Sequence, residues 1–130
     1  MENTLQGEFT LKTKAGDIKL LFSMVYWRLL AQNGIKLEEL ETKLDASKGV
    51  MSMLDTLAII IKSAGEAYSR KFKTEFTLDE DEIFELFEED VNEEVLGELM
   101  KAMTSTRIFG KEMNQGISRA PGKKKPSKKS

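Results

Sequence analysis

Charged residues are sorted along this chain in a way that limits which part of it can fold. Twelve acidic residues and no basic one lie within residues 75–98, and six basic residues and no acidic one lie within residues 119–130. The last segment is rich in Lys, Pro and Ser and has no apolar side chain beyond Ala120. It cannot bury enough apolar surface to offset the entropy lost on ordering. We therefore predict a single domain over residues 1–110 and a disordered basic tail over residues 111–130.

The net charge of −2 conceals this asymmetry. Residues 1–118 contain 14 basic and 22 acidic residues, a net charge of −8, whereas the last twelve residues carry +6. An acidic body with a basic arm is more typical of a protein that binds other macromolecules than of an enzyme.

The chain contains no cysteine and no histidine. Disulfides and thiolate metal sites are therefore excluded, and the commonest general base and transition-metal ligand are missing. Carboxylate pairs such as Asp81 with Glu85 share a helix face, but nothing in the sequence separates their environments. The stretch Asp79–Glu82 lacks the central glycine of an EF-hand calcium loop. We predict no catalytic, cofactor or metal site, and no enzyme. The alternative is a metal-dependent enzyme that uses only carboxylates, which would require Asp or Glu residues from separate segments to converge around a pocket.

The first structured unit is predicted to be a β-hairpin. Apolar and polar side chains alternate from Glu8 to Lys14, which is the two-residue period of a strand with one buried face, and Ile18, Leu20 and Phe22 then alternate with Lys19. A turn is expected at Ala15-Gly16-Asp17. The apolar face must pack on helices, because an isolated hairpin is marginal in water.

About five helices are expected after the hairpin, which makes the fold α+β and mostly α. An apolar helix should follow Ser23 and end at Asn33-Gly34, and a short amphipathic helix should cover residues 37–44. A long central helix should start near residue 50, with Gly65 weakening it. Two capping boxes, Thr77 with Glu80 and Asp90 with Glu93, predict the starts of the last two helices.

The central helix is also the predicted partner-binding element. Its inner stripe includes Val50, Leu54, Leu57 and Ile61, and the methionines fall partly off that stripe. Methionine adapts to varied partners and recurs at promiscuous binding surfaces. For Leu54, Leu57 and Ile61 the pattern favours ordinary core packing, whereas Met51, Met53 and Ile60 fall partly off the stripe and are the better candidates for a contact surface. The residues predicted to contact a partner are Met51, Met53, Leu57, Ile60 and Phe84.

No membrane segment is predicted. The most apolar run, residues 50–61, is too short to cross a bilayer and contains Asp55, and the first residues lack a signal-peptide pattern. These features predict a soluble cytoplasmic protein.

In the order, length and hydrophobic pattern of its segments, the chain resembles the small tail assembly chaperones of long-tailed bacteriophages and prophages. The resemblance covers most of residues 7–104 and rests on the successive segments GEFTLKTKAGDIKLLFS, MVYWRLLAQNGI, KLEELETKL, LDTLAIIIKSAGEAY, TLDEDEIFELFEED and VNEEVLGELMKAM. It implies a non-enzymatic helical protein made in the cytoplasm of the bacterial host. Such proteins coat the tape measure protein and keep it soluble until tail tube protein assembles around it. The family has no site motif to transfer to single residues.

The basic tail supports a different function. Its lysines could contact phosphates, which makes a small nucleic-acid-associated regulatory protein the alternative. The tail lacks aromatic residues for base stacking, and the acidic body opposes the approach of a polyanion, so we predict that nucleic acid is not the partner. Self-association into a homo-oligomer is a further expectation, because so small a domain cannot hide all of its large apolar side chains.

Overall fold

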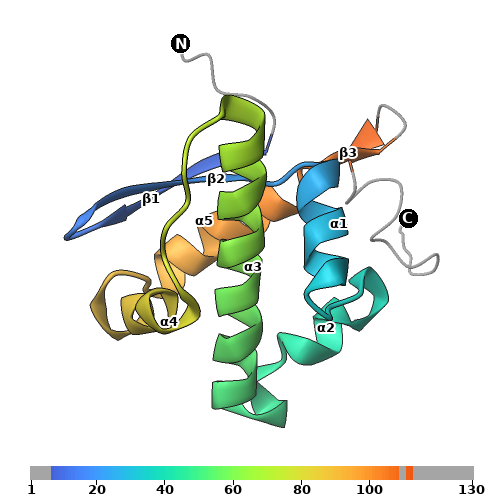
Figure 1. Cartoon of the computed structure of the whole chain (residues 1–130). Helices are drawn as coiled ribbons and strands as arrows, with labels where there is room; N and C mark the ends of the chain where they lie inside the picture. Colours follow the sequence, from blue (N-terminus) through green and yellow to red (C-terminus); the bar gives the residue numbers. More distant parts are fainter. Residues whose placement is uncertain (1–6, 109–110, 113–130) are drawn as a thin grey trace.

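The computed structural model of the protein describes residues 7–108 and 111–112, in which a β-hairpin precedes five α-helices (Figure 1). The predicted α+β fold, mostly α, is confirmed. In chain order the elements are β1 (Glu8–Thr13), β2 (Gly16–Leu21), α1 (Met24–Gln32), the 3-10 turn η1 (Leu37–Glu39), α2 (Leu40–Lys43), the 3-10 turn η2 (Ala46–Lys48), α3 (Val50–Phe72), α4 (Glu80–Glu89), α5 (Glu93–Met103), β3 (Arg107–Ile108) and β4 (Lys111–Glu112).

The predicted boundary between domain and tail, at residues 110 and 111, lies between β3 and β4. β4 pairs antiparallel with β3, so the first two residues of the predicted tail belong to a small second hairpin. Residues 113–130 lie outside the described residues, and the disorder expected there stays a prediction.

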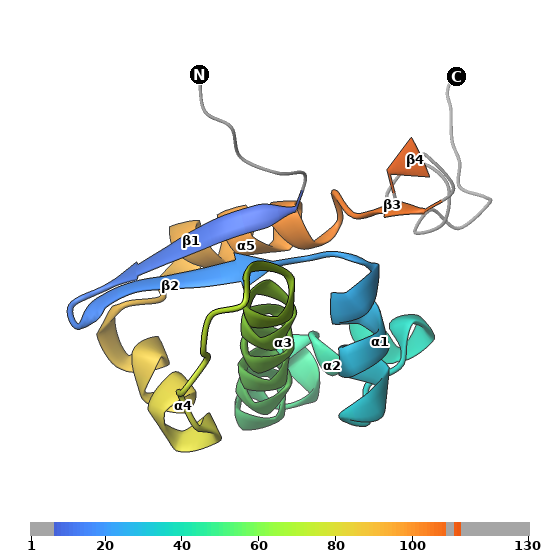
Figure 2. The ribbon, with the colours of Figure 1, turned by 45° about the horizontal axis from the view of Figure 1, so that its top comes forward.

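Helix α3 is the centre of the fold. α1 packs along one side of it and α4 along the other, while the β1–β2 hairpin crosses its C-terminal half (Figures 1 and 2). α5 lies beside β1 (Figure 2). Because neighbours cover α3 on several sides, its residues are buried almost all round from Thr56 to Ala67. No helix in the described part of the chain is both long and apolar enough to span a membrane.

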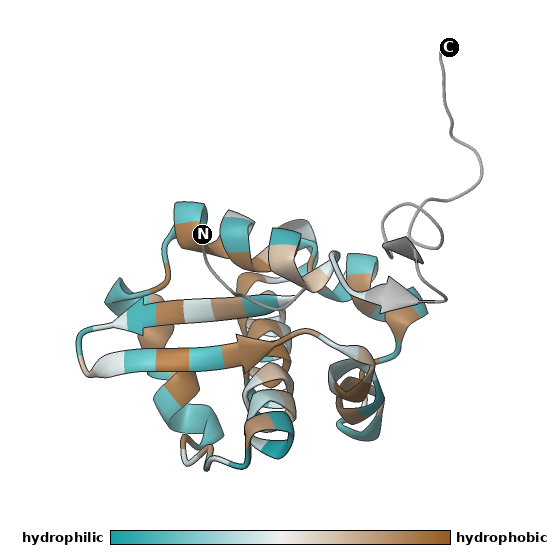
Figure 3. Cartoon of the chain, turned by 90° about the horizontal axis from the view of Figure 1, so that it is seen from above, coloured by the Kyte–Doolittle hydropathy of each residue, from teal (hydrophilic) through white to brown (hydrophobic). Residues whose placement is uncertain are grey.

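The hairpin has the alternating pattern expected of a sheet with one buried face. Brown and teal residues alternate along both strands in Figure 3. Phe9 pairs with Leu20 and Leu11 with Ile18, and Leu11 and Leu20 are completely buried. The turn comes earlier than predicted, at residues 14–15 instead of 15–17. Gly16 opens β2 with a φ of 134°, a conformation that L side chains rarely adopt.

Two predicted helix caps are wrong by two residues. Asp79, and not Thr77, caps α4: it accepts from the Glu82 amide, and the Glu82 carboxylate accepts from the Asp79 amide. Asn92 caps α5 through the Val95 amide. Asp90 instead lies at the C-terminal end of α4 and accepts a hydrogen bond from the backbone of Lys14 at the hairpin tip.

Gly65 lies in the middle of α3 without bending it. The ring of Phe76, from the segment that joins α3 to α4, occupies the space that a Cβ atom at Gly65 would need. Gly65 therefore has a packing function, because its missing side chain lets the α3–α4 connection lie directly against the helix.

The N-terminal and C-terminal parts of the domain meet at the side chain of Thr106, which is buried. Its hydroxyl oxygen accepts from Trp27 Nε1 at 3.0 Å and lies 2.8 Å from the carbonyl oxygen of Phe22. Nearby, the hydroxyl of Tyr26 reaches the sulfur of Met103 at 3.2 Å. These contacts join β2 and α1 to the end of α5.

Replacing Thr106 with valine should lower the free energy of unfolding by about 1–3 kcal/mol, because buried polar partners are left unpaired. Urea unfolding provides the measurement. Thr104→Val is the matched control, since among the described residues the Thr104 hydroxyl donates to backbone carbonyls of its own helix, and the substitution should cost clearly less. Equal losses for the two variants would contradict a special contribution of the Thr106 contacts.

Candidate functional site

The five predicted partner-binding residues do not form one surface. Met51 is 62% exposed, whereas Met53 and Phe84 are partly buried and pack against the core. Leu57 and Ile60 are buried completely or nearly so, which corrects their assignment to a partner surface. The physical reason is the position of α3, whose neighbours cover the side that the sequence pattern leaves free as well as the predicted inner stripe.

Exposed apolar surface begins instead at the start of α3. Val50 is 55% exposed beside Met51, and Met53 and Leu54 lie half-buried next to them. We call these four residues the α3 N-terminal patch. Val50 was expected in the buried stripe, but the first turn of α3 extends past the elements that cover its middle (Figure 1).

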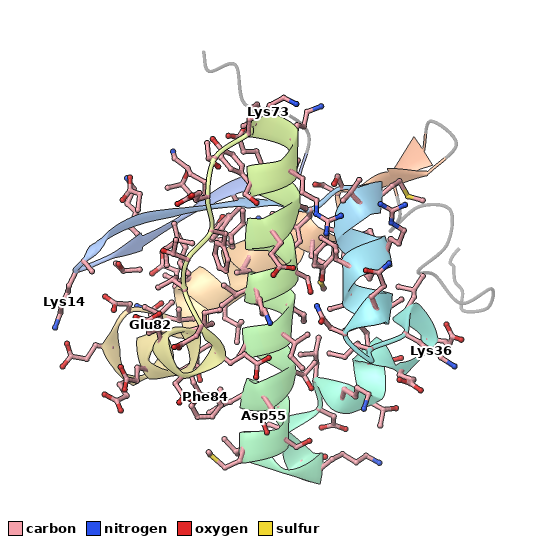
Figure 4. All side chains as sticks on the ribbon, viewed as in Figure 1. Lys14, Lys36, Asp55, Lys73, Glu82 and Phe84 are labelled. Atoms are coloured by element: carbon pink, nitrogen blue, oxygen red, sulfur yellow. The ribbon has the colours of Figure 1, made fainter. Side chains whose placement is uncertain are left out.

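Phe84 belongs to a different neighbourhood. Figure 4 shows it on α4, below the helix and toward α3. Its ring meets that of Phe87 edge to face, with centroids 5.8 Å apart. This pair is part of the packing between α4 and the core, so Phe84 contributes little free surface.

A second exposed apolar group lies at the start of α1, the helix that the sequence predicts to be apolar. Met24 is 54% exposed, and Val25 is exposed beside it. They border a hollow of about 430 Å³ between α1 and the end of α3, which we call the α1–α3 hollow. Its lining residues are Leu21, Ser23, Met24, Val25, Arg28, Ala67, Arg70 and Lys71. In the sequence, this surface is indicated by the position of Arg28, which lies one helical turn after Met24 and therefore on the same face of the predicted helix.

Another hollow, of about 340 Å³, lies between β2 and the segment that joins α3 to α4. Tyr68, Phe76 and Leu78 contribute apolar surface, and Asp17 and Glu75 contribute carboxylates. Within the described part of the chain, no three acidic residues are placed so that they could hold a metal ion together.

The acidic run is distributed over helix ends and solvated faces. Asp79 and Glu82 serve as the capping box of α4, so they have a structural role. Glu80 forms an ion pair with Lys62 at 3.6 Å, and Glu89 forms one with Lys14. The pair with Lys14 is exposed and the pair with Lys62 is partly so, and surface ion pairs of this kind contribute little to stability.

In the part of the chain that the structure describes, two side chains have clearly shifted pKa values. Burial raises the pKa of the Tyr26 phenol, because the charged phenolate would lose its hydration inside the core. The side-chain and backbone hydrogen bonds from Ser47 lower the pKa of the exposed Asp45 carboxyl, which caps η2. Tyr26 contacts aromatic rings and a methionine sulfur, and Asp45 caps a turn, so both shifts have structural causes.

No protein-family model, curated protein or solved structure matches this chain.

Proposed function

We propose that this protein is a tail assembly chaperone of a long-tailed bacteriophage or prophage. In this role it binds the tape measure protein and keeps it soluble while tail tube protein assembles around it. The sequence resemblance supplies the family. The observation that carries the binding function is the α3 N-terminal patch, in which the consecutive residues Val50 and Met51 both expose large apolar side chains in the first turn of α3.

The chemistry of the patch suits a client that must be released. Burying one large apolar side chain on binding contributes roughly 1.5–3 kcal/mol, so a few contacts of this kind give useful and reversible affinity. The thioether chains of Met51 and Met53 adapt to different shapes, which fits a long client with varied sequence. The neighbouring Asp55 is exposed on the same half of α3, as Figure 4 shows, and adds charge that keeps a complex soluble.

Substituting aspartate for both Val50 and Met51 should weaken binding to the tape measure protein by at least about tenfold, because two apolar contacts are lost. The change in the free energy of unfolding should stay within about 0.5 kcal/mol, as for other surface sites. Ser52→Asp is the matched control, since it adds a carboxylate in the same exposed turn without removing apolar surface. Pull-down with purified components, accompanied by thermal melts, provides the measurement.

Co-expression with the tape measure protein of the same genome tests the function itself. We expect the client to be soluble and to be recovered in a complex with this protein. A client that is equally soluble without it, with no complex recovered, would refute the chaperone function. Binding to nucleic acid that collapses with salt and requires residues 119–130 would favour the alternative, a nucleic-acid-associated regulator.

A further inference from the structure

The α1–α3 hollow is chemically unlike the rest of this acidic protein. Its floor is apolar, with Leu21 and Ala67 buried and Met24 and Val25 exposed at its edge. Three of its eight lining residues are basic and none is acidic. The body around it has a net charge of −8. The hollow is therefore a basic, partly apolar site on a domain whose net charge is acidic.

The three basic side chains of the rim are available to a partner. Arg28, Arg70 and Lys71 are all exposed, and none of them forms an ion pair with a carboxylate in the described part of the chain. They come from two helices, so they face the hollow from both of its sides. The N-terminal end of α1 and the C-terminal end of α3 both border the hollow, so their helix dipoles oppose each other and the positive charge of the rim comes from the three side chains.

We propose that the α1–α3 hollow is a docking site for an acidic amphipathic segment of a partner protein. An apolar side chain of the partner would occupy the floor beside Met24 and Val25. Carboxylates on either side of that side chain would meet Arg28 on one helix and Arg70 and Lys71 on the other. This arrangement matches helix-in-groove recognition, in which an apolar stripe binds and flanking charges set the orientation.

Charge complementarity distinguishes this occupant from the others. The basic C-terminal segment of this chain would be repelled by the rim. A nucleic acid would find phosphate contacts but no aromatic ring in the lining on which a base could stack. The acidic helix α4 of a second copy has its apolar side chains packed in its own core.

The docking site is separate from the α3 N-terminal patch. Val50 lies at the first residue of α3 and Lys71 near its last, about 30 Å apart at the rise of an α-helix. In Figure 4, the label of Lys73 marks the end of α3 next to which α1 begins. Binding at the α1–α3 hollow can therefore be tested separately from binding at the α3 N-terminal patch, and without tape measure protein.

A synthetic peptide of about five helical turns, with leucines along one face and glutamates on the others, is a direct probe. Titrated into the isotopically labelled full-length protein, it should shift the amide NMR signals of Met24, Val25, Arg28 and Arg70. A peptide with lysine in place of every glutamate should leave them unchanged. Shifts confined to other elements, or equal binding of both peptides, would overturn the proposal.

Charge-neutralising variants complete the test. The double variant Arg28→Gln/Lys71→Gln should lower the affinity for the acidic peptide about fivefold or more. The control double variant Lys36→Gln/Lys48→Gln, at exposed lysines elsewhere, should change that affinity less than about twofold. Binding of a single-stranded oligonucleotide at these residues in preference to the peptide would assign the hollow to a polyanion and refute the proposal. So would self-association in the absence of peptide that the first variant abolishes, because the occupant would then be a second copy.

Discussion

Replacing Ile60 with aspartate should abolish the cooperative unfolding transition of this domain. Ile60 is completely buried in α3, where an ionised carboxylate would have no partner. The cost of burying such a charge exceeds the stability of about 5–15 kcal/mol that a small domain possesses. Circular dichroism should show loss of helix at 25 °C, and any loss of partner binding would follow from unfolding.

The milder Ile60→Ala should lower the free energy of unfolding by about 2–5 kcal/mol while leaving a folded protein. Met51→Asp supplies the comparison on the same helix, because its side chain is mostly exposed and the variant should melt like the parent protein. A folded Ile60→Asp variant with parental melting temperature would mean that this side chain faces a groove, as the sequence pattern predicts.

Replacing Gly65 with alanine should destabilise the protein, although the same change stabilises most helices. A Cβ atom at this position meets the ring of Phe76, which must move away. Overpacking of this kind costs typically about 1–3 kcal/mol. Gly97→Ala is the matched control: Gly97 lies within α5 with open space around it, so the substitution should stabilise by about 0.5–1 kcal/mol.

A double-mutant cycle assigns the cause of the Gly65 effect. If the clash with the ring is responsible, Phe76→Leu should recover much of the stability lost in Gly65→Ala, since the two sites are in contact. Denaturant unfolding of the four proteins gives the coupling free energy. Additive effects of the two substitutions would show that the ring is not the obstacle.

The hairpin and the central helix could be predicted from sequence because their signals are periodic over many residues. Phe9, Leu11 and Leu20 alternate with polar residues, and the structure places them as expected. The helix caps could not be located as well. Within a run of acids, Thr77 with Glu80 and Asp79 with Glu82 both satisfy the capping-box spacing, and local sequence does not decide between them.

The candidate surfaces were harder to predict because exposure depends on which elements pack together. The single apolar stripe on the central helix predicts that one face of this helix is buried, and it places Ile60 at the edge of that face. Packing of α1, α4 and the hairpin around α3 buries Ile60, while the end positions Val50 and Met51 stay exposed. The exposure of Met24 depends on where α1 meets the last turn of α3, which no local pattern specifies.

The contacts around Thr106 affect the order in which the protein can be completed as it is synthesised. The hydrogen bond between Thr106 and Phe22 spans 84 positions, and the contact between Tyr26 and Met103 spans 77. Contacts this distant form late, because a long loop must close before they add stability. Until α5 has been made, a nascent chain can pack its hairpin and α1 against α3, but the surface of β1 that α5 covers and the groups around Thr106 stay exposed. Each new molecule therefore carries some unpaired apolar surface, and with it a risk of aggregation, until the end of α5 leaves the ribosome.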